Sequence, residues 1–75
     1  MDEDYKGHHI QSTAKPIIES GRWIPHVVIR WMRGGVGEEF IQFDVKRGFA
    51  TEQDAEEAGV TFAKQWIDER KPRIR

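Results

Sequence analysis

Two hydrophobic periods divide the chain into a sheet-forming part and a helix-forming part. Across residues 22–47, apolar and polar side chains alternate, as they do in a strand that buries one face. Across residues 51–71, the apolar positions recur at helical spacing instead. These positions are Ala55, Ala58, Phe62, Ala63, Trp66 and Ile67. The change of period predicts a small antiparallel sheet followed by one helix that covers a single face of it.

Three strands are expected before the helix. The first is weakly marked, over residues 5–14, and Gly7 weakens its start. The second, over residues 22–33, is rich in β-branched and aromatic side chains, and the third follows over residues 38–47. Pro25 cannot donate to a ladder, so full pairing of the second strand should begin after it or include a bulge. The predicted fold class is α+β, with a three-stranded antiparallel meander and one C-terminal α-helix packed on one face.

The length of the glycine-rich turn at residues 34–37 decides how the second and third strands pair. A strict two-residue turn places Ile29 opposite Phe40 and scatters the apolar residues between the two faces. A loop of three or five residues places Ile29 opposite Ile41 and gathers the apolar residues on one face. The glycines suit this looser loop, which is therefore the predicted one.

Local signals set the limits of the helix. Thr51 is an N-cap candidate, with Asp54 three residues later in an acidic variant of the capping box. A glycine in mid-helix lowers stability by about 1 kcal/mol relative to alanine. Gly59 is therefore expected to allow a close approach of the helix backbone to the sheet. Pro72 ends the helix. Replacing Phe62 by Ala should cost about 3–5 kcal/mol, as for a core aromatic residue. The side chains expected to be mostly buried are Trp23, Val27, Ile29, Trp31, Ile41, Phe43, Val45, Phe49, Phe62 and Trp66.

Length and composition indicate one small domain. The chain has 75 residues and no Cys, which leaves neither a disulfide nor a thiolate metal site. Residues 1–75 are expected to form a single domain with flexible ends at residues 1–4 and 72–75. The acidic first residues do not resemble a signal peptide, and no apolar run approaches membrane-spanning length. A cytoplasmic location without membrane attachment is therefore expected.

Charge is unevenly distributed although its sum is close to zero. The formal net charge is −1. Residues 5–50 hold seven Lys or Arg and four acidic residues, whereas residues 51–69 hold six acidic residues and Lys64. The predicted sheet is therefore mildly positive and the helix strongly negative. Residues 70–75 add four cations, which suit either phosphate contacts or, more simply, the negative end of the helix dipole.

One short motif resembles part of a known family. The sequence Phe49-Ala50-Thr51-x-x-x-Ala55-Glu56 resembles the strand-to-helix junction of the AP2-like arm-binding domain of phage-type integrases. The resemblance implies that Phe49 packs under the helix, that Thr51 caps it and that the sheet face enters the DNA major groove. The opening Tyr5-x-Gly7-x-x-Ile10 and the closing Trp66-Ile67-Asp68 look like those of small stand-alone bacterial proteins with the same layout. The double-stranded-RNA-binding fold is a weaker match, because it begins with a helix.

No constellation typical of catalysis or metal binding stands out. His8 and His9 are adjacent, so on a strand they point to opposite faces, and His26 can meet His9 only in a suitable register. No serine lies in a nucleophile elbow, and the glycine-rich segment lacks the Lys-Ser/Thr of a phosphate-binding loop. The protein is therefore expected not to be an enzyme and to need no cofactor or metal.

The sheet face away from the helix is the best candidate for function. It is expected to combine cationic, polar and apolar side chains, which suits either a protein interface or nucleic-acid contacts. Two functions remain open. One is a bacterial interaction module that binds a protein partner or a second copy of itself. The other is a nucleic-acid-binding accessory protein. The candidate binding residues are His9, Gln11, Lys15, His26, Arg30, Met32, Phe40, Gln42 and Lys46.

Overall fold

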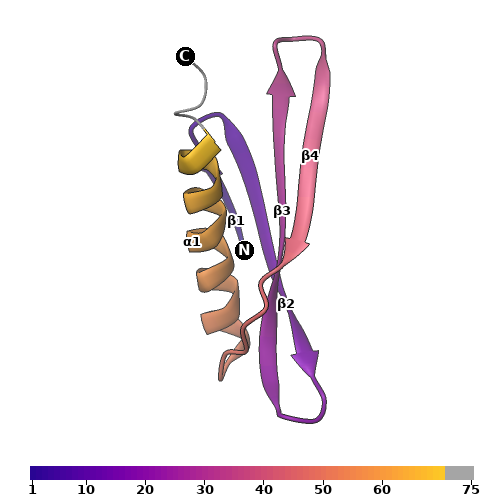
Figure 1. Cartoon of the computed structure of the whole chain (residues 1–75), viewed down its shortest axis with the longest axis vertical. Coiled ribbons are helices and arrows are strands. Elements are labelled where there is room, and N and C mark those ends of the chain that lie inside the picture. The colour runs from indigo at the N-terminus through magenta and orange to yellow at the C-terminus, as the bar shows by residue number, and fades with distance from the viewer. Residues whose placement is uncertain (71–75) are drawn as a thin grey trace.

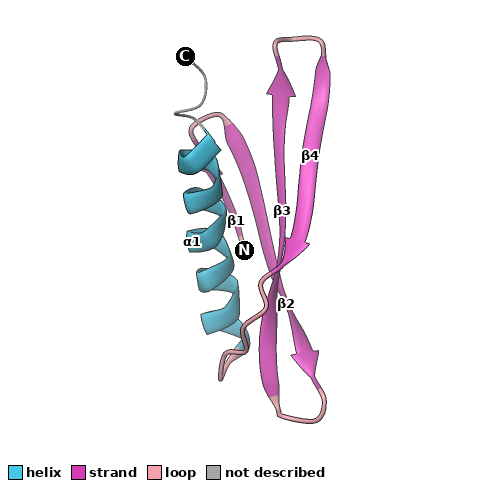
Figure 2. Cartoon of the chain, in the orientation of Figure 1, coloured by secondary structure: helices cyan, strands magenta, loops and turns pink. Residues whose placement is uncertain are grey.

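The protein folds as one four-stranded antiparallel sheet with a C-terminal helix on one face (Figure 1). The computed structural model describes residues 1–70. The strands are β1 (Asp2–Tyr5), β2 (His8–Ile17), β3 (Arg22–Arg33) and β4 (Gly37–Asp44), and the helix α1 spans Glu52–Arg70 (Figure 2). The four strands lie in the sheet in the order in which they occur along the chain. The α+β class and the C-terminal helix are confirmed, but the prediction of three strands is wrong by one.

The additional strand comes from the N-terminal residues, where a flexible end was expected. The expected first strand divides at Lys6 and Gly7, which have φ angles of 49° and 79°. Tyr5 pairs with His8 across this two-residue turn. Two consecutive positive φ angles belong to a type I′ hairpin turn, which Asn-Gly or Asp-Gly usually signals. Lys rarely adopts a positive φ, so the sequence carried only a weak sign of this hairpin.

The register between β3 and β4 agrees with the looser loop. Ile29 pairs with Ile41, and Arg33 pairs with Gly37 across three loop residues. Gly34 and Gly35 have φ angles of 54° and 76°, which glycine adopts at no steric cost. The predicted register is confirmed, and the alternating apolar side chains of both strands share the face that carries α1.

Pro25 determines where β4 ends. The Val45 N–H donates to the Pro25 carbonyl at 2.9 Å, but Pro25 has no N–H to return the bond. The Val45 carbonyl instead accepts from the Arg47 N–H at 2.8 Å, and the pairing with β3 is interrupted until Phe49 bridges to Trp23. Strand β4 therefore stops at Asp44 rather than at Arg47. On the other side of β3, Pro25 pairs with Ala14 within an unbroken register, so the predicted interruption affects only the β4 side.

The core lies between α1 and the two central strands. Its buried members are Ile10, Val27, Ile29, Val60, Ala63 and Ile67. Of the ten side chains expected inside, Val27 and Ile29 are fully buried, and the other eight are half-buried. The helix meets the sheet through its small and aliphatic residues, so Phe62 and Trp66 lie on its flank. The Trp66 ring packs 5.7 Å from that of Trp31, centroid to centroid.

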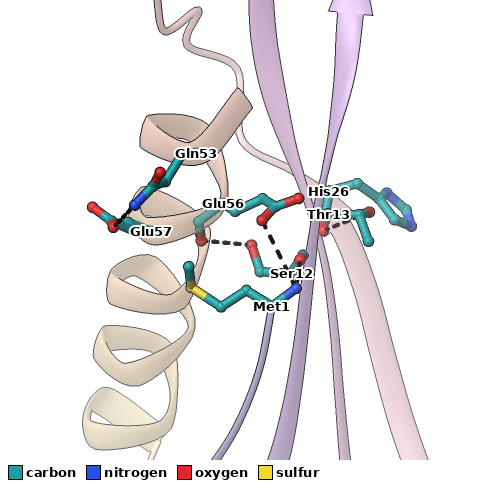
Figure 3. A network of polar contacts seen from close by, with 7 residues as sticks. All are labelled: Met1, Ser12, Thr13, His26, Gln53, Glu56 and Glu57. Atoms are coloured by element: carbon teal, nitrogen blue, oxygen red, sulfur yellow. Dashed lines mark hydrogen bonds and ion pairs between the residues drawn. The ribbon is translucent and has the colours of Figure 1, made fainter. Parts of the chain in front are cut away.

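Gly59 brings the helix backbone close to β2. Ser12 is fully buried, and its hydroxyl donates to the Glu56 carbonyl at 2.8 Å. A Cβ atom on Gly59 would lie 2.1 Å from the Ser12 Oγ, so only glycine fits beside this serine. Figure 3 shows Ser12 pointing at the helix, with the Met1 amine donating to the Ser12 carbonyl at 2.8 Å. The expected role of Gly59 is confirmed.

The start of α1 is capped locally, and its other end is tied to the sheet. The Thr51 hydroxyl accepts from the Asp54 N–H at 3.0 Å, which confirms Thr51 as the N-cap. Near the other end, Asp68 accepts from the Tyr5 hydroxyl at 3.0 Å and from the Lys6 ammonium at 2.8 Å. The hydrogen bond from Lys6 to Asp68 raises the pKa of that lysine. These contacts hold the β1–β2 turn against the helix.

Candidate interaction face of the sheet

The sheet face opposite α1, called the open face below, contains the predicted binding residues. Because side chains alternate along each strand, the pairing register assigns each residue to one face. Lys46 follows the end of β4, and the other eight predicted residues lie on the open face. The open face includes Asp2, Asp4, His9, Gln11, Thr13, Lys15, Ile17, Arg22, Ile24, His26, Val28, Arg30, Met32, Glu38, Phe40, Gln42 and Asp44.

Cross-strand pairing arranges these side chains in rows. His9, Arg30 and Phe40 form one row across β2, β3 and β4. Gln11, Val28 and Gln42 form the next row, and Thr13, His26 and Asp44 the one after it. His9 and His26 therefore lie two rows apart and do not meet. His8 points to the other face, where its ring lies 5.4 Å from that of Trp31, centroid to centroid.

A small ionic cluster forms around Asp44. The His26 Nδ1 lies 2.6 Å from one carboxylate oxygen of Asp44, and the Lys15 Nζ lies 3.2 Å from the other. The hydrogen bond with His26 is the largest influence on the pKa of Asp44, and the Lys15 contact adds to it; both lower that pKa. The carboxylate of Asp44 thus offsets the charge of Lys15 within the face, which reduces the positive charge offered to a ligand.

Two acidic residues on this face were missed in the sequence. Asp2 and Asp4 project from β1 beside His9, whose Nδ1 lies 2.8 Å from Asp4 and whose Nε2 lies 3.8 Å from Asp2. Treating residues 1–4 as a flexible end hid them. Alternation from a hairpin turn at Lys6 would have placed both acids on the open face. The face therefore carries mixed charge instead of the mildly positive charge expected.

Large apolar side chains remain exposed at the β3–β4 end of the open face. Met32 is 62% exposed and Phe40 is 60% exposed. The two are diagonal neighbours on adjacent strands, and the half-buried Val28 lies in the next row. Arg30 stands beside Phe40, is exposed, and has no ion-pair partner among the described residues. This group of Val28, Arg30, Met32 and Phe40 is called the apolar patch below.

Neither a metal site nor a membrane helix is found in the part of the chain that the structure describes. Among residues 1–70, no three His, Cys, Asp or Glu side chains gather closely enough to hold a metal ion. Within the same range, α1 is too polar to cross a membrane.

The whole chain corresponds to a known domain family. The model of a domain of unknown function, DUF6566, matches residues 1–74. The chain belongs to this family. No curated protein and no solved structure matches the chain.

Proposed function

We propose that the protein is a small non-enzymatic interaction module that binds a protein partner, or a second copy of itself, through the open face. The observation that carries the proposal is the apolar patch, in which Met32 and Phe40 expose about three fifths of their surface. Exposed apolar groups rimmed by polar ones are typical of protein interfaces. The helix covers the opposite face, so the patch is accessible along β3 and β4.

Site-specific cross-linking in cells that produce the protein tests this proposal. A photo-reactive amino acid at position 32 should form adducts with a defined protein, because Met32 would be buried in the complex. The matched control places the same group at Glu57, on the exposed side of α1. The Phe40→Glu substitution should abolish the adducts from position 32. Equal labelling from positions 32 and 57 would contradict the proposal.

A second proposal is that the open face contacts nucleic acid. It is supported by Arg30, which is exposed and has no ion-pair partner among residues 1–70, and by the exposed Lys46. Asp2 and Asp4 weaken it, because they place negative charge on the same face. Fluorescence anisotropy with short duplex DNA at low salt distinguishes the two proposed functions. Binding that weakens in Arg30→Ala and Lys46→Ala, and falls steeply with salt, would favour nucleic acid.

A further inference from the structure

We propose that two copies of the chain join antiparallel through the free edge of β4, with Gln42 on the two-fold axis. The first support is the direction of the β4 backbone groups. Val45 bonds back to β3, and hydrogen-bonding residues alternate along an antiparallel strand. The N–H and C=O groups of Glu38, Phe40, Gln42 and Asp44 therefore point away from β3. Along β4 they form a row of donors and acceptors without partners in the sheet.

The two edges of the sheet differ in their suitability for pairing. Edge strands usually avoid self-association by being short, or by carrying a proline, a lysine or a bulge. The β1 edge has four residues, three of them acidic, so two copies of it would repel each other. The β4 edge has eight residues, without proline or lysine, and its register with β3 contains no bulge. Pairing is therefore expected at β4.

The side chains of β4 are self-complementary about Gln42. A two-fold axis requires each residue of a surface to meet its counterpart in the other copy. With Gln42 opposite the partner's Gln42, the two strands pair over residues 40–44. Glu38 then faces the partner's Lys46, which follows the end of its β4, and this ion pair can form twice. Both side chains are exposed and have no ion-pair partner among the described residues of their own chain. Phe40 lies opposite the partner's Asp44 in the same register.

The neighbouring registers are less favourable. Centring the pair on Ile41 places Glu38 opposite the partner's Asp44, so two like-charged pairs replace two ion pairs. Centring it on Phe43 leaves only residues 42–44 of each copy paired within β4, which ends at Asp44, against residues 40–44 in the register centred on Gln42. In the register centred on Gln42, the central backbone pairs lie within β4, and the charged side chains that face each other have opposite signs.

The helix-side face of the same register is apolar. Ile41 would lie opposite the partner's Phe43, and both side chains are half-buried in the single chain because α1 packs mainly on β2 and β3. A surface hollow beside the edge is lined by Trp31, Ile41 and Trp66 among others. The two-fold axis stands perpendicular to the sheet, so both helices would lie on one side. The partner's strand would cover part of the apolar surface that one helix leaves open.

This interface goes beyond the proposed function, because it uses the edge of the sheet. It includes Phe40 of the apolar patch but leaves Val28, Arg30 and Met32 accessible. The two surfaces can be tested apart. Met32 lies on β3, away from the edge, so Met32→Glu should abolish binding through the open face and leave the edge dimer unchanged. A dimer that dissociates in Met32→Glu would instead show association through the open face and would overturn the edge interface.

Charge exchange gives the decisive test, read by sedimentation equilibrium over a concentration series. Glu38→Lys and Lys46→Glu should each raise the dimer dissociation constant about tenfold, because two pairs turn from attractive to repulsive. The double variant Glu38→Lys/Lys46→Glu should restore the original constant. The strand from Glu38 to Asp44 alone is about 20 Å long and Lys46 lies beyond its end, so rescue within a single chain is excluded.

A second pair of variants separates loss of the dimer from loss of folding. Gln42→Lys places two lysines against each other on the axis and should weaken the dimer, whereas Thr13→Lys adds the same charge to the same face on β2 and should not. Circular dichroism should show all variants folded, since each altered side chain is exposed. A wild-type chain that stays monomeric at about 1 mM, a concentration that reveals even weak complexes, would overturn the proposal. So would a double variant without rescue.

Discussion

Gly59 and Ser12 illustrate how one missing side chain shapes the helix–sheet contact. Replacing glycine by alanine in mid-helix normally stabilises a protein by about 1 kcal/mol. Here the new Cβ would lie 2.1 Å from the Ser12 Oγ and 3.2 Å from a Val27 methyl group. We therefore expect Gly59→Ala to lower the free energy of unfolding by about 1–3 kcal/mol, as overpacking does. Urea denaturation measures this change.

The control for this prediction is another glycine. Gly37 has no positive φ, and a Cβ added there would meet no atom within 4 Å, so Gly37→Ala should leave the stability nearly unchanged. The double variant Gly59→Ala/Ser12→Ala removes the closest contact. It should lose less stability than the two single variants together. Additive losses would contradict a direct clash between positions 59 and 12.

Asp44 should make stability depend on pH in the acid range. Its pKa is lowered in the folded state by His26 and Lys15. The ionised carboxylate therefore stabilises the fold above the ordinary aspartate pKa of about 3.9, and this contribution disappears as the pH falls through the lower folded pKa. Thermal melting between pH 6 and pH 3, as an approximate range, should show a smaller loss of stability in Asp44→Asn than in the wild type. Glu19→Gln, in the exposed β2–β3 turn, should follow the wild type.

At the scale of the element, α1 packs through a narrower stripe than its sequence predicts. Ile67 is 1% exposed and belongs to the core, whereas Phe62 lies half-buried on the flank of the helix. Ile67→Ala should therefore lower the free energy of unfolding by about 2–5 kcal/mol. Phe62→Ala should cost less, about 1–2 kcal/mol, because part of the ring is already in water. Denaturant melts of the two variants check the order, and a larger loss for Phe62→Ala would contradict it.

Elements with strong local signals were predicted well from the sequence. Residues 22–33 alternate β-branched and aromatic side chains, and β3 has the predicted limits. Thr51 and the helical spacing after it located the start of α1 to within one residue, whereas the end predicted at Pro72 and the flexible end predicted at residues 72–75 lie outside the described residues. The β1–β2 hairpin lacked such a signal, because Lys6 adopts a positive φ only with the support of the surrounding sheet. The exact side of α1 that faces the sheet depends on Gly59 and could not be read from periodicity alone.

At the scale of the whole molecule, the sheet is longer than its helix. The molecule extends 43 Å along its longest axis, whereas a helix of 19 residues is about 28 Å long. Both the β2–β3 and the β3–β4 turns project beyond α1 (Figure 1). Trp23 lies near the projecting β2–β3 turn, and Trp31 packs against Trp66 on the flank of the helix, so both tryptophans, expected inside, are only half-buried. Sequence periodicity assigned them to the correct face but carried no information on how far one helix reaches.

The composition of the open face could be predicted from the sequence only in part, because some of it depends on long-range contacts. Its β2, β3 and β4 residues follow from alternation and register, which the sequence indicates. The acids of β1 and the pairing of Asp44 with His26 and Lys15 depend on long-range contacts. Together they turn a mildly positive surface into a mixed one, while the acidic helix lies on the opposite side. A ligand that needs a uniform positive field is therefore poorly matched to this molecule.

The order of the strands also bears on how the chain reaches its structure. Each strand pairs with its neighbour in the chain, so the sheet can grow by adding one hairpin to the next, and every step closes only a short loop. Docking of the helix is different, because the bond from Ser12 to Glu56 joins residues 44 positions apart. The meander can therefore form from local contacts, but its apolar face stays in water until the last part of the chain arrives. For this protein, the step that buries the core is also the step that brings Asp68, near the end of α1, against Tyr5 and Lys6 of the first hairpin.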